Sequence, residues 1–393
     1  MKKRPLAGLV LASTLTASLV AVPGAGSAEA KPKPFAHPGV VVSKKQLDYV
    51  KKNIKKQPYK AAYAAMRRSP LASLKRRPHA VKVVHCIGYG GPGDNIDCGI
   101  ERDDAMAAYT NALIWYISRD KRRLTLAGIY LNAWSRTLKS HTGADTLLQE
   151  AWAGTTWARA AELVKHSMPK GKKWNQQKRF ATMLRTKYLP YLIKGKQEGV
   201  NGNWDLVMAD AAIGISVFLD DRKSFDKSVR LLRSRVPAYF YLKSDGPKPR
   251  PPVDGVMPDI DTYWFQPPGG APAVYADGME QETCRDRVHP SYSLAATMHV
   301  IATAQIQRVN LASEFQRRIT AAMEFQSKYS LSPVPAWLCG GKLNDVMQPA
   351  LEIAYATYHK KAKLPWTRKK MLKQRPAGAS VFMAWETLTS GVR

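Results

Sequence analysis

The sequence has few cysteines, few acidic residues and little strand-like alternation. Its 393 residues include four cysteines without a CxxC pair or a clustered histidine spacing, so no zinc site is expected. After the first 30 residues no apolar run is long enough to span a bilayer, which argues against an integral membrane protein. A fixed-length repeat is also missing, which argues against TPR-like or HEAT-like arrays.

Acidic residues are outnumbered by basic ones. The chain has 61 Lys and Arg against 30 Asp and Glu, a formal charge of +31. Such an excess attracts polyanions, although it can also serve solubility alone. Nucleic acid is the default partner of an intracellular basic protein. For an exported basic protein, acidic polysaccharides are an equally reasonable class of partner. A nuclease is disfavoured because the sequence has no metal-ligand cluster, and no nucleic-acid partner is expected.

The first 30 residues have the pattern of a secretory signal peptide. Three basic residues at positions 2–4 precede an apolar stretch over 6–22 and a small-x-small site that ends at Ala30. We expect cleavage near Ala30 and secretion of residues 31–393 as one domain, a monomer without membrane attachment. Removal of three basic residues and one acidic residue leaves 58 minus 29, a charge of +29.

The four cysteines are expected to form disulfides, because an exported protein meets an oxidising environment. Cys86 and Cys98 bracket a glycine-rich loop and are predicted to pair, which leaves Cys284 for Cys339. Four cysteines allow three pairings, and free buried thiols are the alternative.

Apolar residues recur at helical spacing along most of the chain, and Ala and Leu are frequent. Short connections predict antiparallel helix hairpins, so the expected fold class is all-α, an (α/α) toroid formed as an incomplete barrel of such hairpins, with a groove where loops meet. The sequence leaves open whether the ring closes fully. The longest irregular stretch, 243–277, holds several aromatic residues. Helices are expected over 104–118, 121–138, 144–166, 178–194, 203–219, 224–235, 289–309, 311–329 and 348–360.

The segment 277–292, DGMEQETCRDRVHPSY, concentrates charged and titratable groups. Proline fits the first turn of a helix, so a helix is predicted to begin near Pro290 with Tyr292 in that turn. A helix N-terminus and nearby arginines favour the phenolate, which predicts a lowered pKa for Tyr292. Anionic substrate chemistry and an ion-pair cap of the helix are the two interpretations.

Short motifs follow one another in a definite order. They are HPGV at 37–40, DAMAAY at 104–109, AWS at 133–135, AWAG at 151–154, AAEL at 160–163, NGNW at 201–204, the charged and aromatic positions of 281–292, EIAY at 352–355 and WETLT at 385–389. This order, over roughly three hundred residues, resembles the alginate lyase superfamily of polysaccharide lyases, which fold as an (α/α) toroid.

The resemblance implies β-elimination on a uronic acid polymer of the alginate or glucuronan kind. Tyr292 would be the acid and base, and Arg285 would set its pKa and bind a carboxylate. Asn203 would neutralise the substrate carboxylate, and His289 would orient or assist. Trp204 stands where the family pattern has a histidine. This departure favours a tyrosine-only route or a base from elsewhere, and it keeps a non-catalytic polyanion-binding protein open.

Further residues are candidates for substrate binding, each with a structural alternative. Asparagine is a frequent N-cap, so Asn203 has that alternative role. Acidic and amide side chains near arginines can simply hold those arginines in place, and large aromatics are most often core residues. The candidates are Asn201, Trp204, Arg287, Gln281, Glu282, Tyr263 and Trp264.

Neither an organic cofactor nor a metal is required by the implied mechanism, and a calcium-binding loop is missing. A glycoside hydrolase would need two carboxylic acids, and the best candidates, Glu282 and Asp286, lie beside arginines that disfavour a general acid. The histidines at 85, 141, 166, 299 and 359 have no evident partner in the sequence and are expected to be structural.

Overall fold

The computed structural model describes residues 33–88, 97–195, 202–253, 260–264, 274–343 and 346–392. The chain divides into residues 1–34 and a compact unit over 35–393, and the following concerns the second unit. The predicted signal peptide, Asn201 and the side chain of Tyr263 lie outside the described residues.

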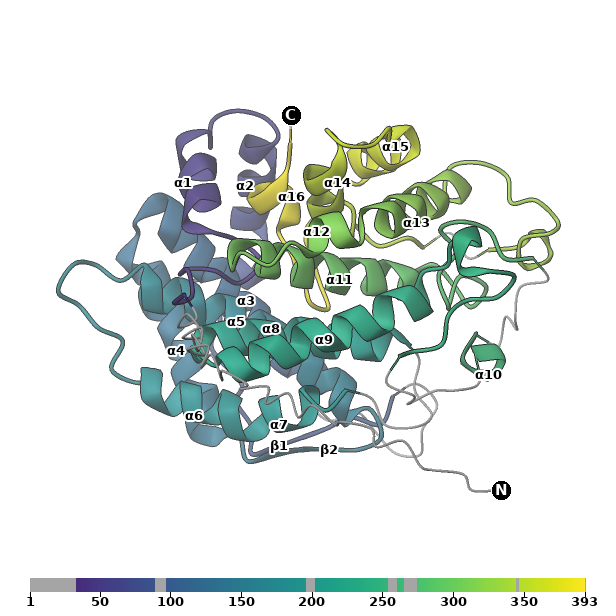
Figure 1. Cartoon of the computed structure of the whole chain (residues 1–393). Coiled ribbons are helices and arrows are strands. Elements are labelled where there is room, and N and C mark those ends of the chain that lie inside the picture. The colour runs from purple at the N-terminus through teal and green to yellow at the C-terminus, as the bar shows by residue number, and fades with distance from the viewer. Residues whose placement is uncertain are drawn as a thin grey trace, which may run out of the picture. The chain divides into compact units, whose positions relative to one another are not determined.

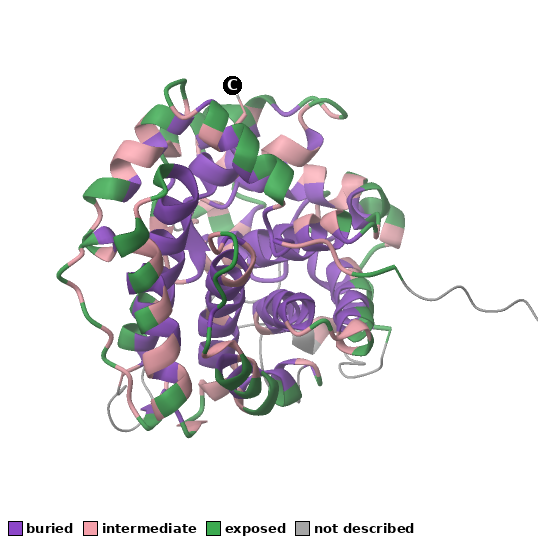
Figure 2. Ribbon diagram, turned by 90° about the vertical axis from the view of Figure 1, so that its left-hand side faces the viewer, coloured by how far each residue is buried: buried purple, intermediate pink, exposed green. Residues whose placement is uncertain are grey.

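Long inner helices form the centre of the fold. They are buried on almost every face, as Figure 2 shows, because small alanine side chains let neighbouring helices approach on all sides. Each packs against the next along the chain. In order they are α3 (Cys98–Ser118), α5 (Thr146–His166), α8 (Gly202–Phe218) and α11 (Val288–Ile306).

Amphipathic helices cover the inner ones and expose their charged faces (Figure 2). The outer helices are α4 (Lys121–Thr137), α6 (Gln177–Lys187), α9 (Arg222–Tyr239) and α13 (Gln316–Tyr329). Helix α4 packs against α3 and α9 against α8, as Figure 1 shows for α9, whereas α6 and α13 contact α8 and α11 less closely. This alternation of inner and outer helices is the hairpin arrangement that the helical periodicity predicts.

Helices from the two ends of the chain close the ring. Contacts lead from α11 through α14 (Glu352–Tyr358) and α16 (Glu386–Ser390) to α1 (Lys44–Lys52), which contacts α3. The Tyr59 hydroxyl, on α2 (Tyr59–Arg68), donates to the Gly391 carbonyl at 2.6 Å. Helices α1, α2 and α16 lie side by side in Figure 1. The all-α toroid is confirmed, and its circuit of helices closes within the described chain.

Some predicted helices differ from the observed ones. The stretch 178–194 is split into α6 and α7 (Leu189–Leu192), because Pro190 fits only the first turn of a new helix. The stretch 311–329 is likewise split into α12 (Leu311–Glu314) and α13. The helices predicted from the sequence do not include α1, α2, α15 (Pro365–Gln374) or α16. The short α10 (Ile260–Trp264) lies in the stretch expected to be irregular.

Very little sheet is present in the described part of the chain. Strand β1 (Val83–His85) pairs in parallel with β2 (Ser140–Thr142), and β3 (Ala379–Ser380) pairs antiparallel with β4 (Met383–Ala384). The β3–β4 turn carries Phe382, which is fully buried.

Both predicted disulfides are confirmed. Cys86 bonds to Cys98, and Cys284 bonds to Cys339 in the short 3-10 turn Cys339–Gly341. The second bond fastens the segment before α11 to the C-terminal part of the chain. No helix among the described residues has the length and apolarity needed to cross a membrane.

Candidate active site

Tyr292 lies where α5, α11 and the β3–β4 turn meet. Helix α11 begins at Val288, so Pro290 occupies its first turn as predicted and Tyr292 follows directly after that turn. The Tyr292 ring is half-buried, with its centroid 6.1 Å from Trp152 and 5.8 Å from Phe382. Edge contacts with aromatic rings therefore fix the direction of the phenol.

The predicted lowering of the Tyr292 pKa is wrong. Burial raises the pKa of the Tyr292 phenol, and the nearby charge of Asp286 adds to this, while the Arg102 guanidinium opposes both. Desolvation disfavours the phenolate more than one cation favours it. Tyr292 is therefore a phenol in the free protein at neutral pH.

Arg102, on α3, is the cation whose charge acts on Tyr292. Its guanidinium donates to Gln149 Oε1 at 2.7 Å and lies over the Trp152 ring, 5.1 Å from the centroid. Arg102, Gln149 and Trp152 line a cavity of about 270 Å³. The Trp152 Nε1 is buried without a hydrogen-bond partner among the described residues, so it is a donor available to a ligand.

Glu282 joins the two sequence motifs of the site. Its Oε2 accepts hydrogen bonds from Asn203 Nδ2 at 2.7 Å and from the Tyr239 hydroxyl at 2.8 Å. Its Oε1 accepts from Arg285 at 2.9 Å. Asn203 was predicted to be either a site residue or an N-cap. It lies inside α8, and Glu282 holds its amide nitrogen. Arg285 pairs with Glu282 and lies 3.9 Å from Asp286, the ion pairs that were its structural alternative.

Asp286 orients His289 and caps α11. Its Oδ1 accepts from the backbone nitrogens of Val288 and His289, and its Oδ2 lies 2.7 Å from His289 Nδ1. Burial alone would raise the pKa of Asp286, but the hydrogen bonds and charge of His289 lower it. A carboxylate on Nδ1 places the lone pair of a neutral imidazole on Nε2. His289 also makes an edge contact with Tyr292, at 6.2 Å between centroids.

A family model described as Alginate lyase matches residues 41–246, just over half of the chain. The chain belongs to the alginate lyase family. This assignment makes the protein a polysaccharide lyase. The matched residues include α3, α5 and α8, whereas the segment around Tyr292 lies beyond them.

The fold of this lyase is similar to solved structures at low identity. An alginate lyase from Bacteroides ovatus is 14% identical with a TM-score of 0.54, covering 91% of this chain and 100% of its own. Alginate lyase A1-III from Sphingomonas species A1 is 13% identical with a TM-score of 0.60, covering 90% and 95%. A variant of A1-III complexed with a tetrasaccharide is 13% identical with the same TM-score, covering 84% and 90%. A search of curated proteins found no match.

The remaining predicted site residues of the lyase lie at varying depth. Gln281 is buried, and its Oε1 accepts from the Gly202 nitrogen at 2.8 Å, so it supports the start of α8. Arg287 is buried and donates to the Tyr329 carbonyl at the end of α13. Trp204 is partly buried against the core. Trp264 is 1% exposed, and its indole donates to the Ala238 carbonyl, so it is a core residue rather than a sugar platform.

Two larger cavities lie away from Tyr292. One of about 740 Å³ is lined by residues of α1, α11 and α14, and one of about 470 Å³ is lined by Arg287 and residues 329–334. We favour the smaller cavity because a cation, an unpaired indole donor and a contact to Tyr292 coincide only there among the described residues.

Sequence reasoning missed Arg102 and assigned no role to Trp152. Arg102 lies in the charged run at the start of α3, ahead of the helix predicted over 104–118, and nothing local connects it with a residue 190 positions later. Trp152 lies within the AWAG motif at 151–154, and its place in that motif was the one feature of the sequence that could have pointed to a role in the site.

Proposed function

We propose that the protein is a secreted lyase that cleaves a uronic acid polymer, of the alginate or glucuronan kind, by β-elimination with Tyr292 in proton transfer. One observation carries the proposal. Tyr292 packs on Trp152, the charge of Arg102 acts on its phenol, and Arg102 and Trp152 line one cavity. A proton-transfer group, a cation and a neutral donor are thereby gathered for an anionic sugar.

In the elimination, a base removes the proton on C5 of the uronate at the cleaved bond. The electron pair of that C–H bond forms the C4–C5 double bond, and the glycosidic oxygen leaves C4 and takes a proton. Arg102 and the Trp152 indole are suited to the carboxylate, whose negative charge must be offset as charge develops on it. Tyr292, held as a phenol by its raised pKa, is suited to protonate the leaving oxygen.

Two groups are candidates for the base. Tyr292 can act itself once ionised, or His289 can act through Nε2, because Asp286 fixes its Nδ1. In the second route the histidine base comes from α11. It takes the part of the histidine that the family pattern has at position 204, where this chain has Trp204.

The polymer class is tested by incubating the chain from Lys31 onward with alginate, glucuronan and a neutral glucan. We expect ultraviolet absorbance of an unsaturated uronate to appear with at least one polyuronate and not with the glucan. New reducing ends without absorbance would indicate hydrolysis instead. Salt-sensitive binding without any cleavage would support a polyanion-binding protein, and either result would contradict the proposal.

The pH dependence of kcat/KM separates the two bases. If Tyr292 is the base, activity rises with pH towards the raised pKa of the phenol, because only the phenolate accepts the proton. If His289 is the base and Tyr292 the acid, activity instead falls at high pH as Tyr292 ionises, because the leaving oxygen then loses its proton donor. Circular dichroism at each pH controls for unfolding. Activity highest in acid and falling through neutral pH would contradict both routes.

A further inference from the structure

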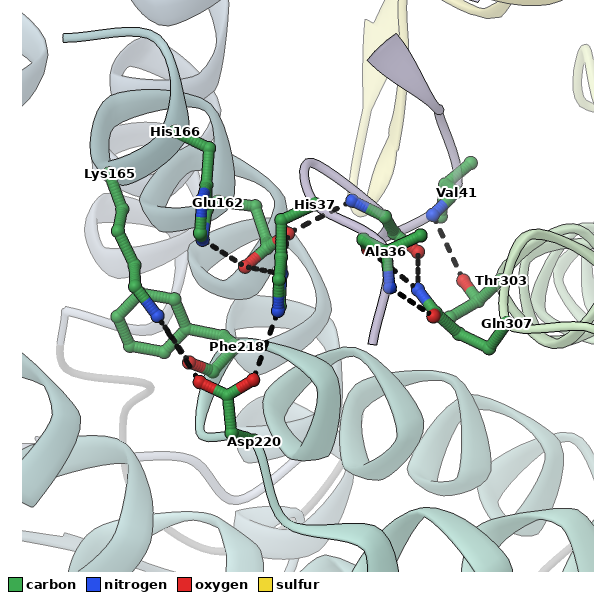
Figure 3. A network of polar contacts seen from close by, with 11 residues as sticks. Ala36, His37, Val41, Glu162, Lys165, His166, Phe218, Asp220, Thr303 and Gln307 are labelled. Carbon is green, nitrogen blue, oxygen red and sulfur yellow. Dashed lines mark hydrogen bonds and ion pairs between the residues drawn. The ribbon is translucent and has the colours of Figure 1, made fainter. Parts of the chain in front are cut away.

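A second group of titratable side chains lies where the N-terminal segment crosses α5 (Figure 3). His37 Nδ1 is 3.0 Å from Glu162 Oε2, and His166 Nε2 is 3.5 Å from Glu162 Oε1. Glu162 and His166 are four residues apart and share one face of α5. Three side chains from two distant segments therefore converge on one point.

The separations suit a common metal ion. Zinc binds imidazole nitrogen and carboxylate oxygen at about 2.0–2.2 Å, so two ligand atoms of a tetrahedral site lie roughly 3.3 Å apart. The distances from His37 Nδ1 and His166 Nε2 to the same oxygen, Glu162 Oε1, are 3.1 and 3.5 Å and bracket that value. One ligand atom from each of the three residues lies within 4.8 Å of the others. Two histidines and one glutamate, with a fourth position for water, form a known type of zinc ligand set.

The surroundings of the three residues also fit a metal site. Histidine ligands usually direct their second nitrogen to a carboxylate, and His37 Nε2 lies 3.0 Å from Asp220 Oδ1. Gly39 N donates to Glu162 Oε2 at 2.9 Å and steadies that carboxylate. The buried His166 Nε2 has only a long contact, 3.5 Å to Glu162 Oε1, so little binding is lost when it turns to a metal.

We propose that His37, Glu162 and His166 bind one divalent transition-metal ion of the zinc type, with Asp220 orienting His37. The His37 and His166 rings are stacked, 4.3 Å apart and 4° from parallel. A metal lies near the plane of each imidazole that binds it, so one ring turns when the ion enters. His166 is the ring with room to turn, because it ends α5 and its side chain is 23% exposed against 15% for His37.

Such an ion would fasten the N-terminal segment to the toroid. That segment is already bonded to α11 and its C-cap residue: Thr303 Oγ1 accepts from the Val41 nitrogen, and Gln307 Oε1 accepts from the Ala36 nitrogen (Figure 3). The metal would add a second attachment, to α5. Because it binds only the folded state, it raises thermal stability with metal concentration.

The test uses the chain from Lys31 onward without an affinity tag, first treated with a chelator. Zn²⁺ is titrated calorimetrically, Co²⁺ is followed by its visible absorption, and melting temperature is measured with each. We expect one ion per chain, tetrahedral Co²⁺ bands and a higher melting temperature. Asp220→Asn should weaken affinity roughly 10- to 100-fold, the usual effect of losing a group that orients a ligand.

His166→Gln is the decisive variant, because it removes only a long 3.5 Å contact with Glu162 and the metal-free fold should persist. It should bind Zn²⁺ at least about a hundredfold more weakly, since a direct ligand matters more than an orienting group. His359→Gln is the control, because His359 also ends a helix and stacks on an aromatic ring, Tyr355. No stoichiometric binding by the wild type, or equal binding by both variants, would show an ion-pair cluster without a metal and overturn the proposal.

Discussion

Tyr292→Phe should lower kcat on a cleaved polyuronate by about 10²- to 10⁴-fold, the range typical of a lost general acid or base. The substitution removes only the phenol oxygen. No described residue hydrogen-bonds to that oxygen, and the ring contacts with Trp152 and Phe382 remain. We therefore expect an unchanged melting temperature and little change in KM, so that the loss falls on the chemical step.

The matched control is Tyr355→Phe, at another partly buried tyrosine packed against the core, on α14. Its kcat should stay close to that of the wild type. Initial rates are followed by absorbance of the unsaturated product. Turnover by Tyr292→Phe within a few-fold of the wild type would exclude proton transfer by Tyr292, whatever the polymer.

The inner helices could be predicted from the sequence, but the closure of the ring could not. Helices such as α5 and α8 are long, and apolar residues recur at three- and four-residue spacing along their whole length. This spacing is the strongest local signal of a helix. The helices that close the circuit, α1 and α16, are short, and α1 is rich in lysine. Their positions depend on contacts between the two ends of the chain, which no local pattern reveals.

The site could be predicted only where its groups are neighbours in the chain. Glu282, Arg285, Asp286 and His289 lie within eight positions, so their interactions were accessible. The direction of the Tyr292 pKa was missed because burial, which dominates it, is a tertiary property.

The histidines illustrate the same limit. His299 lies between Asp210 and Glu386, at 2.7 Å from each carboxylate, although both partners are almost ninety residues away. His141 likewise contacts Glu101, forty residues earlier. Spacing in the sequence therefore gave these histidines no partner, and the His37–Glu162–His166 group was hidden for the same reason.

Glu282→Gln should damage both activity and stability, because one carboxylate holds Asn203, Tyr239 and Arg285 together. The amide keeps the shape but replaces one accepting oxygen with a donor that faces other donors. It also leaves the Arg285 cation without its closest partner. Unpairing a buried charge costs about 3–5 kcal/mol, and the 28% exposure of Arg285 places the expected loss near the lower end.

The catalytic loss should arise through Asn203, which Glu282 positions and which the family resemblance implies as the residue that neutralises the substrate carboxylate. A displacement of about 1 Å in a positioning group can cost roughly a hundredfold in rate, so we expect kcat/KM to fall by up to that factor. Asn203→Ala combined with Glu282→Gln should then lose less than the product of the two single losses, because both changes disturb the same contact. Purely structural damage would instead give multiplied losses.

Glu280→Gln is the control that the chain itself offers. Glu280 is fully buried two residues from Glu282, and neither of its oxygens has a hydrogen-bond partner in the described chain. Burial, together with the charge of Glu282, raises the pKa of Glu280 well above its ordinary value against the opposing effect of Gln326, so the protonated carboxyl is favoured. An amide is close in shape and charge to a neutral acid, and this variant should keep its activity and melting temperature. Equal losses in both variants would refute a specific role for Glu282, because they would trace the effect to the shared backbone segment.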